Sequence, residues 1–366
     1  MRSFFSLVSS ALFLFLSALL ADCALAEGLP GYGEPLMGAG PVSGRVEMEF
    51  DLSRYPAGQQ VRLWIPYPES DRWQQVYGFS IMGDYDYAAV HTDRRFQNPI
   101  LYVEWNPGHK KRHLTFSFSV ERMERHDGYE GGAQEPCWSP ADWRRYLAAT
   151  SLAPVSGPVA ELAARITRGC SSVHEKARAI YDWICDTLRR DPAVRGCGAG
   201  DVCVVLDRKG GKCVDIHSVF VALARAAGVP AREVFGLRLG RSGQADITSG
   251  YHCWAEYYQP GFGWVVVDPA DVTKAVLERD LDRRSHEVMR LRQYYWGSVD
   301  PYRIRLSYGR DLVLNPKQTG GPVNYLMYPF AQAGGKTLDW LDPAGFSYRI
   351  TWRPGNGPAS GEGTGP

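Results

Sequence analysis

The sequence predicts an α+β fold, in which a central helix packs on an antiparallel sheet and a small β-sandwich domain precedes this core. Three stretches of the 366 residues carry the prediction. Residues 45–125 contain short runs of alternating apolar and polar side chains, which is typical of half-buried strands. Residues 213–227 have an almost wholly apolar helical face, and residues 251–268 have the pattern of two strands joined by a tight turn.

The N-terminus has the pattern of a removable signal peptide over residues 1–26. An apolar run covers 4–20, and residues 24–26 have the small-x-small pattern of a cleavage site. Two alternatives are left open: an uncleaved membrane anchor, although the run is short beside the ~20 residues of a spanning helix, and lipoprotein processing at Cys23, where Asp22 replaces the expected small residue. We expect a periplasmic or secreted bacterial protein with no membrane span after signal cleavage.

Charge and composition exclude one class of partner. The chain carries 41 basic and 40 acidic residues, a net charge of +1, and has no long basic run. Such a balance creates no field that attracts nucleic acid or anionic lipid, so we expect no nucleic-acid partner. With 45% apolar and 12% aromatic residues, the chain can bury one large core or two ordinary ones. The oligomeric state is not predictable from these features.

The cysteines predict disulfide bonding. Loss of Cys23 with the signal peptide leaves seven of the eight cysteines. An oxidising compartment favours disulfides, and because seven is odd, one thiol must stay free or pair outside the chain. The one local pair that we expect joins Cys197 to Cys203, across a short loop that contains Gly198 and Gly200.

The first third of the chain is predicted to hold a linker and the β-sandwich domain. Residues 27–44 are rich in Gly and Pro and show no periodicity, which indicates a linker. Strict alternation begins at Arg45, and the theme recurs through residue 125, so we assign 45–125 to a small β-sandwich domain. Its clearest strands are expected at 45–52, 61–65, 100–104 and 113–120.

The core domain is predicted over 140–300. Helices are expected at 142–149, 156–167 and 172–188, the last with a Ser-x-x-Glu capping box, and then at 213–227 and 271–293. A Gly/Cys-rich loop is expected at 195–212, and strands are expected at 233–239, 251–258 and 264–268. Residues 301–353 are predicted to extend a sheet as a C-terminal β extension, and the Gly/Pro/Ser-rich tail 354–366 is expected to be disordered.

Cys213 is the candidate nucleophile. It follows two glycines and a lysine and begins the predicted central helix. A thiolate attacks carbonyl carbon, and the pKa of a thiol falls at a helix N-terminus or beside an imidazolium. The glycines let the backbone turn sharply, so the first N–H groups of the helix are expected to stabilise the thiolate and later an oxyanion. Alone, a cysteine at a helix start is more often an inert thiol or a disulfide partner.

His252 and Asp268 supply the partners that a reactive thiol needs. In alternating strands with an even register, Asp268 projects to the same side of the hairpin as His252 and lies within side-chain reach of it. The aspartate can then orient the imidazole through one ring nitrogen while the other faces the thiol. A lone histidine in a strand is usually a satisfied core or surface residue, but three suitable residues in suitable local structures predict a Cys-His-Asp triad.

Four motifs in order resemble the transglutaminase-like superfamily of papain-type folds. They are Gly-Gly-Lys-Cys at 210–213, Arg-Ala-Ala-Gly-Val-Pro-Ala-Arg at 225–232, His-Cys-Trp-Ala-Glu at 252–256 and Gly-Trp-Val-Val-Val-Asp-Pro at 263–269. The resemblance covers roughly 150–275, and residues 45–125 look like the β-rich N-terminal region of bacterial members.

This resemblance implies that Cys213 is the nucleophile, His252 the general base and Asp268 its orienting partner. It does not specify the reaction, because the superfamily includes transglutaminases, proteases, amidases and members with no known activity. Cys253 departs from the pattern, since a small apolar residue is commoner there. This departure leaves redox or metal chemistry beside the base as an alternative.

Together these features predict an exported, cysteine-dependent acyl-transfer enzyme that forms a thioester. The expected substrate is a protein, peptide or cell-envelope amide, and hydrolysis is favoured over transglutaminase-type crosslinking because water is in excess. The sequence does not identify the acyl donor or acceptor.

Two alternatives belong to other classes. The first is a non-catalytic exported binding or assembly module on the same fold. The second is a zinc protein, since Cys213 and His217 lie one helical turn apart. Four further residues are candidate ligands for such a zinc ion: Cys197, Cys203, His252 and Cys253. The sequence lacks tight Cys-x-x-Cys pairs here, so we expect no metal and no cofactor.

Overall fold

The computed structural model describes residues 40–127, 140–241 and 243–355. Its strands are β1 Val42–Asp51, β2 Val61–Pro66, β3 Gln74–Gly83, β4 Tyr87–Thr92, β5 Pro99–Trp105, β6 His113–Arg122, β7 Arg125–His126, β8 Arg189–Arg190, β9 Gly210–Gly211, β10 Ala231–Arg238, β11 Ala245–Asp246, β12 Tyr251–Gln259, β13 Gly263–Val267, β14 Ser298–Val299, β15 Arg303–Tyr308, β16 Phe330–Ala333, β17 Lys336–Thr337 and β18 Ser347–Pro354. Its helices are α1 Pro140–Leu147, α2 Pro158–Ile166, α3 Val173–Thr187, α4 Val202–Arg208, α5 Cys213–Ala226, α6 Pro269–Glu278 and α7 His286–Tyr294.

The β-rich region consists of two antiparallel sheets of five strands. Their orders are β11-β18-β1-β6-β3 and β17-β16-β2-β5-β4. The alternation predicted for the first strand is confirmed, because Val46, Met48 and Phe50 are buried while the residues between them are more exposed. These side chains share one apolar cluster with Leu63 and Val103 of the other sheet. The two sheets therefore have a common hydrophobic core.

The C-terminal segment contributes to three sheets. β18 pairs with β1 in the first sheet, and β16 pairs with β2 in the second. β15 instead joins the sheet of the core, where it pairs with β10. The segment from 301 onward thus completes both the β-rich region and the core.

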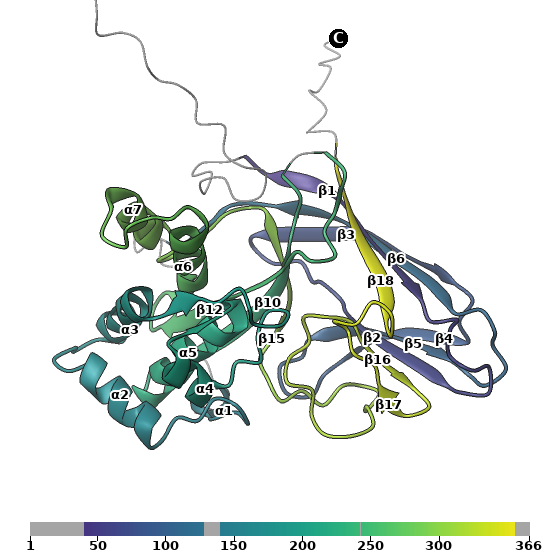
Figure 1. The fold of residues 1–366 in the computed structure, drawn as a ribbon, viewed down its shortest axis with the longest axis horizontal. Helices are drawn as coiled ribbons and strands as arrows, with labels where there is room; N and C mark the ends of the chain where they lie inside the picture. Colours follow the sequence, from purple (N-terminus) through teal and green to yellow (C-terminus); the bar gives the residue numbers. More distant parts are fainter. Residues whose placement is uncertain (1–39, 128–139, 242, 356–366) are drawn as a thin grey trace, which may run out of the picture. The chain divides into compact units, whose positions relative to one another are not determined.

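The core sheet has the order β13-β12-β10-β15, and all its neighbouring strands are antiparallel. Helix α5 lies against this sheet at β12 and β10, with α3 and α4 beside it (Figure 1). Every residue of α5 from Cys213 to Arg225 is buried. The α+β class, with a central helix on an antiparallel sheet, is therefore confirmed.

The outer edge of β15 is covered by side-chain amides from the β-rich region. The Gln74 amide donates to the carbonyl of Arg305 at 3.1 Å and accepts from its N–H at 2.8 Å. Asn98 makes the same pair of bonds to Tyr308, at 2.9 and 2.7 Å. Unpaired backbone groups at a sheet edge attract other strands, so these amides satisfy the edge without adding a strand.

Several predicted boundaries were wrong. The linker does not reach residue 44, because β1 begins at Val42. Gly44 belongs to this strand, and its missing side chain leaves room for Trp352, since a Cβ there would lie 2.4 Å from the indole. Residue 354 likewise does not belong to a disordered tail, because Pro354 is paired within β18 and the Gly355 N–H donates to the Ser43 carbonyl.

The predicted loop 195–212 contains a helix. α4 begins after Asp201, whose carboxylate accepts the N–H of Val204 at 3.2 Å, as an N-cap residue does. The helical segment predicted over 271–293 consists of the two helices α6 and α7, and β3 and β4 were not predicted. The capping box at Ser172 and Glu175 is confirmed.

The signal peptide, most of the linker and residues 356–366 lie outside the described residues, as do Cys23 and Cys137. Within the described ranges, no helix has the length and apolar character needed to cross a membrane.

Candidate active site

Cys213 is the first residue of α5, and the loop before it is held by the Asp215 side chain. The Asp215 carboxylate accepts the N–H of Lys212 at 3.0 Å and that of Gly200 at 2.8 Å. A Cβ on Gly211 would lie 2.4 Å from the Cβ of Asp215, so only glycine leaves room for this side chain. The glycine-rich segment and the first helical turn are therefore locked together.

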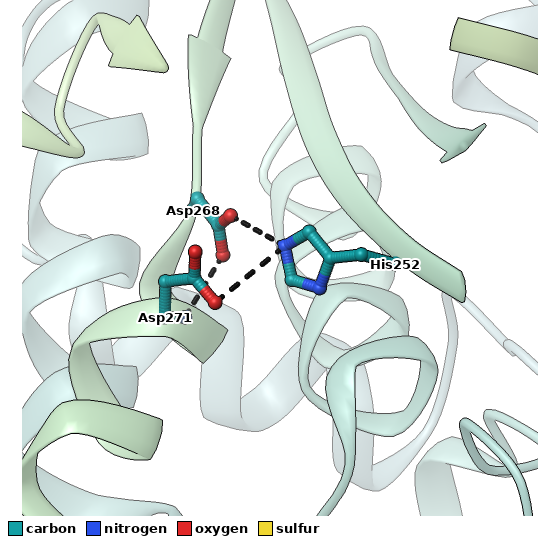
Figure 2. A group of neighbouring side chains, drawn as sticks. All are labelled: His252, Asp268 and Asp271. Carbon is teal, nitrogen blue, oxygen red and sulfur yellow. Dashed lines mark hydrogen bonds and ion pairs between the residues drawn. The ribbon is translucent and has the colours of Figure 1, made fainter. Parts of the chain in front are cut away.

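The hairpin of β12 and β13 brings His252 to Asp268. Ala255 pairs with Val267, which gives the even register that the sequence predicted and places Asp268 diagonally from His252. The Nε2 atom of His252 lies 2.7 Å from Oδ2 of Asp268 (Figure 2). Because a carboxylate only accepts hydrogen bonds, Nε2 carries the proton, and Nδ1 is the nitrogen turned away from the aspartate.

The sulfur of Cys213 has three polar side chains as neighbours. Hydrogen bonds from Cys197 and from Cys253, together with the hydrogen bond and the charge of His252, hold the pKa of the Cys213 thiol well below its usual range despite burial. The hydrogen bond between Cys197 and Cys213 raises the pKa of Cys197. Burial, and to a lesser extent the hydrogen bond between Cys253 and Cys213, raises the pKa of Cys253. The site thus favours one thiolate at Cys213 and two neutral thiols beside it.

Asp268 is the common acceptor of the site. Its Oδ2 accepts from His252 and from Nη1 of Arg303 at 2.6 Å, and its Oδ1 accepts from Nε2 of His217 at 3.1 Å and from the N–H of Asp271 at 3.0 Å. Burial and the charge of Asp271 raise the pKa of Asp268, but the charge of His252 and the bonds from both histidines outweigh them. The pKa lies well below its usual range, so the carboxylate is ionised.

The family model of the transglutaminase-like superfamily matches residues 160–269, a range that contains all three predicted site residues. A Haemophilus influenzae protein described as uncharacterized is 34% identical over 315 residues, which cover 79% of this chain and 85% of that protein. The chain belongs to the transglutaminase-like superfamily.

The chain is also similar to an enzyme sequence and to solved structures. A protein-glutamine gamma-glutamyltransferase of Pseudomonas aeruginosa is 31% identical over 103 residues, which are 26% of this chain and 15% of that protein. Among solved structures, a candidate cysteine protease of Cytophaga hutchinsonii has a TM-score of 0.48 at 14% identity, covering 86% of this chain and 99% of that one. The periplasmic domain of TgpA from Pseudomonas aeruginosa has a TM-score of 0.35 at 16% identity, covering 68% and 92%.

The structure adds a buried ionic cluster that the sequence analysis missed. Arg303 on β15 binds three carboxylates: Asp268, Asp271 at 2.9 Å and Asp300. Arg238 binds Asp271 from another direction at 2.5 Å. Burial raises the pKa of Asp271, but the charges of Arg238, His252 and Arg303 outweigh it and hold that pKa well below its usual range.

Only part of this cluster has a sequence signal. Asp268-Pro-Ala-Asp271 has the spacing of an N-cap residue and the third residue of a helix, which places both carboxylates at one helix end. Figure 2 shows the His252 nitrogen facing both of them. Arg303 and Arg305 alternate with the apolar Ile304 and Leu306, which is typical of a strand, and both arginines are buried. Nothing local indicates that Arg303 reaches Asp268.

The zinc alternative lacks its ligand set in the described part of the chain. There, the group of ligand atoms that lies within 4.8 Å of one another is His252, Asp268 and Asp271, and not the Cys/His set. Cys203 is exposed on α4, whereas Cys213 and Cys253 are buried. At the His252 group, Arg303 and Arg238 already bind the carboxylates and provide the positive charge that a metal would bring.

The predicted Cys197–Cys203 disulfide is wrong. Both residues are free thiols, as are the other described cysteines. The carbonyl of Cys197 accepts the N–H of Val214, and its thiol lies 3.4 Å from the carbonyl of Tyr251. Cys197 thus faces the start of α5, while Cys203 belongs to a separate helix and is exposed.

Proposed function

We propose that this protein is an exported, cysteine-dependent acyl-transfer enzyme that hydrolyses amide or peptide bonds. Cys213 is the nucleophile, His252 the general base and acid, and Asp268 the residue that orients His252. One observation carries the proposal: Nε2 of His252 is bound to a buried carboxylate, so its other nitrogen is available to the Cys213 thiol at a helix N-terminus.

In the acylation step, the Cys213 thiolate attacks the amide carbon and forms a C–S bond. The resulting oxyanion collapses, the C–N bond breaks, and the imidazolium of His252 gives its proton to the leaving amine. This leaves a thioester on Cys213 and a neutral imidazole. Asp268 stabilises the imidazolium before the transfer and keeps the ring in one tautomer throughout.

In the deacylation step, neutral His252 removes a proton from water, and the hydroxide attacks the thioester carbon. The C–S bond breaks, the product leaves as a carboxylic acid, and the thiolate and imidazolium are restored. An amine in place of water would instead form a new amide, which is crosslinking. We propose hydrolysis because water is in large excess over any amine at an exported enzyme.

Two N–H groups at the start of α5 are bonded to other acceptors, which corrects the expectation that the first N–H groups of the helix bind the oxyanion. The N–H of Val214 donates to the Cys197 carbonyl at 3.0 Å, and the N–H of Lys212 donates to Asp215. These two groups are therefore already used. We assign the backbone N–H of Cys213 itself to the oxyanion, since it is the first residue of the helix.

The proposed substrate is a protein, peptide or cell-envelope amide in the periplasm or outside the cell. The segment 1–26 supports export through its signal-peptide pattern. The similarity to a protein-glutamine gamma-glutamyltransferase over 103 residues supports an amide group as the acyl donor.

Incubation of the mature protein with cell-envelope material and with casein, each with and without a fluorescent primary amine, tests the reaction. We expect new amino termini and little amine incorporation, with both signals lost in Cys213→Ala. Cys203→Ala is the matched control, because it removes an exposed thiol on α4. Efficient amine incorporation with few new termini would instead establish crosslinking.

Alkylation of the thiols by iodoacetamide tests the nucleophile without any substrate. We expect Cys213 to be labelled fastest among the cysteines at mildly acidic pH, well below the ~8.5 of an ordinary thiol. His252→Ala should slow that labelling, because the neighbouring imidazolium is gone. Peptide mapping that finds the label on Cys253, or Cys213 in a disulfide in the active protein, would contradict the assignment.

The alternative of a non-catalytic module is favoured by one observation. The Cys213 and His252 residues are each only 3% exposed, so a substrate must displace some neighbouring group to reach the sulfur. A binding module predicts no labelling of Cys213 at any mildly acidic pH and no turnover. The two experiments above therefore separate it from the enzyme.

A further inference from the structure

His217 is a second histidine on the same aspartate. It lies on α5, one helical turn after Cys213, and is fully buried. Its Nε2 is 3.1 Å from Oδ1 of Asp268, and its Nδ1 is 3.3 Å from Sγ of Cys253. The two oxygens of one carboxylate therefore hold two imidazoles, one from β12 and one from α5.

The contacts define the tautomer of His217. An ionised carboxylate cannot donate, so Nε2 of His217 carries a proton and donates to Asp268. The Nδ1 atom on the other side of the ring contacts Sγ of Cys253 at 3.3 Å. Cys253 thus fixes the ring from one side while Asp268 fixes it from the other, as a supporting partner does for a metal-bound histidine.

The position of His217 connects the nucleophile to its base. Cys213 and His217 share one helix, His252 belongs to β12, and Asp268 caps the start of α6. The His217 bond therefore holds α5 against Asp268, and the His252 bond holds β12 against the same group. Arg303 and the N–H of Asp271 keep the carboxylate itself in place.

We propose that His217 is a positioning residue for the acyl-transfer reaction. By donating to Oδ1 it keeps Oδ2 directed at His252 and sets the helix of Cys213 at the correct distance from the imidazole. It touches no substrate atom. This inference rests on the proposed function for its activity readout, but its main readout is the reactivity of Cys213, which needs no substrate.

Two substitutions at this position separate the hydrogen bond from simple packing. His217→Leu removes the N–H donor and replaces the imidazole with an apolar side chain of similar size. His217→Gln keeps an N–H donor at nearly the same reach as Nε2. Ser218→Ala is the matched control, since Ser218 is buried on the same helix but bonds Val214 and Arg310 rather than Asp268.

The rate of Cys213 alkylation by iodoacetamide is measured against pH in each folded variant, and circular dichroism confirms the fold. For His217→Leu we expect labelling near pH 6 to fall about tenfold, because a thiolate that loses its aligned imidazolium has a higher pKa. We also expect kcat to fall about 10- to 100-fold with KM within about twofold, the pattern of lost alignment. His217→Gln should recover most of both, and Ser218→Ala should change neither.

Unchanged labelling and unchanged kcat in His217→Leu, with only a lower melting temperature, would show that His217 is a core residue and overturn the inference. Equal losses in the Leu and Gln variants would overturn the hydrogen-bond mechanism. If the Leu variant does not fold, His217→Asn makes the same comparison, because its amide is too short to reach Asp268. Slow labelling of the wild-type thiol at acidic pH would instead count against the proposed function itself.

Discussion

The β-rich region and the core bury different kinds of side chain. Between the two five-stranded sheets the buried side chains are apolar, with Val46, Phe116 and Leu63 all at 0% exposure. Beside the core sheet the buried groups include a carboxylate at 0% exposure, Asp268, and a guanidinium at 0% exposure, Arg303. Apolar side chains fill the space between the two sheets, whereas the core adds paired charges to an apolar cluster that extends through both regions.

The difference separates stability from positioning. Apolar burial contributes stability directly, at roughly 25 cal/mol per Å². A buried ion pair often stabilises no more than a packed apolar pair would, because removing both charges from water is costly. The directed bonds of Asp268, each to a defined atom, do what apolar contacts cannot: they fix the rotation of an imidazole. We therefore expect mutations in the two interiors to have different signatures.

Asp268→Asn should have the largest effect. The amide keeps the shape but can present an N–H to His252 and so favours the wrong tautomer. Turnover should fall by about 10³- to 10⁴-fold, as in the analogous serine triad, while the protein stays folded by circular dichroism. Turnover within tenfold of the wild type would show that Asp268 does not orient His252.

Arg303→Met should damage both stability and reactivity. It leaves Asp268, Asp271 and Asp300 without their common cation, so we expect a loss of about 3–5 kcal/mol in the free energy of unfolding by urea. Cys213 labelling should slow in the same variant. Arg349→Met is the control, because Arg349 pairs with Asp246 at the surface with a side chain 68% exposed, and it should cost less than about 1 kcal/mol.

Phe116→Ala should affect stability alone. It opens a cavity in the apolar interior and should cost about 3–5 kcal/mol in urea unfolding. At a temperature where the variant is folded, the rate and pH dependence of Cys213 labelling should match the wild type. A shifted labelling profile would mean that the two interiors are coupled, which the comparison above does not predict.

Glu256→Gln should have the smallest effect, which is a change in how the free energy of unfolding depends on pH. Burial raises the pKa of Glu256, but the charges of Arg232 and Arg125 outweigh burial and lower it from 4.5 to about 2. Because the folded pKa lies below the unfolded one, the stabilisation is present above about pH 4.5 and is lost as the pH falls toward 2, a span of about 3 kcal/mol. Urea unfolding of Glu256→Gln should show a smaller loss over this pH range, whereas an equal loss would assign the pH dependence to other carboxylates.

The sequence was sufficient where the signal was local. Alternation and an even hairpin register predicted that His252 meets Asp268, since His252 lies on β12 and Asp268 directly follows the adjoining strand β13. The apolar face of 213–227 predicted a buried helix with Cys213 at its start, and both the fold class and the superfamily are confirmed. The elements needed only the period of a strand and of a helix, whereas the superfamily rested on the resemblance of four motifs.

What the sequence could not predict depends on strand order. Arg303 reaches Asp268 because β15 joins the sheet beside β10, and no local pattern specifies that neighbour. The Cys197–Cys203 disulfide failed for a related reason, since a glycine-rich spacing suggested a free loop where a helix begins after Asp201. The orientation of His217 toward Asp268 likewise requires the three-dimensional position of α6.

The pairing of the C-terminal strands has a consequence for folding during synthesis. β1 and β2 are made well before β18 and β16, the strands that pair with one edge of each. Until those later strands have been made, that edge of β1 and of β2 offers unpaired backbone to other strands. We therefore expect folding intermediates that lack β16 and β18 to aggregate more readily than the complete fold.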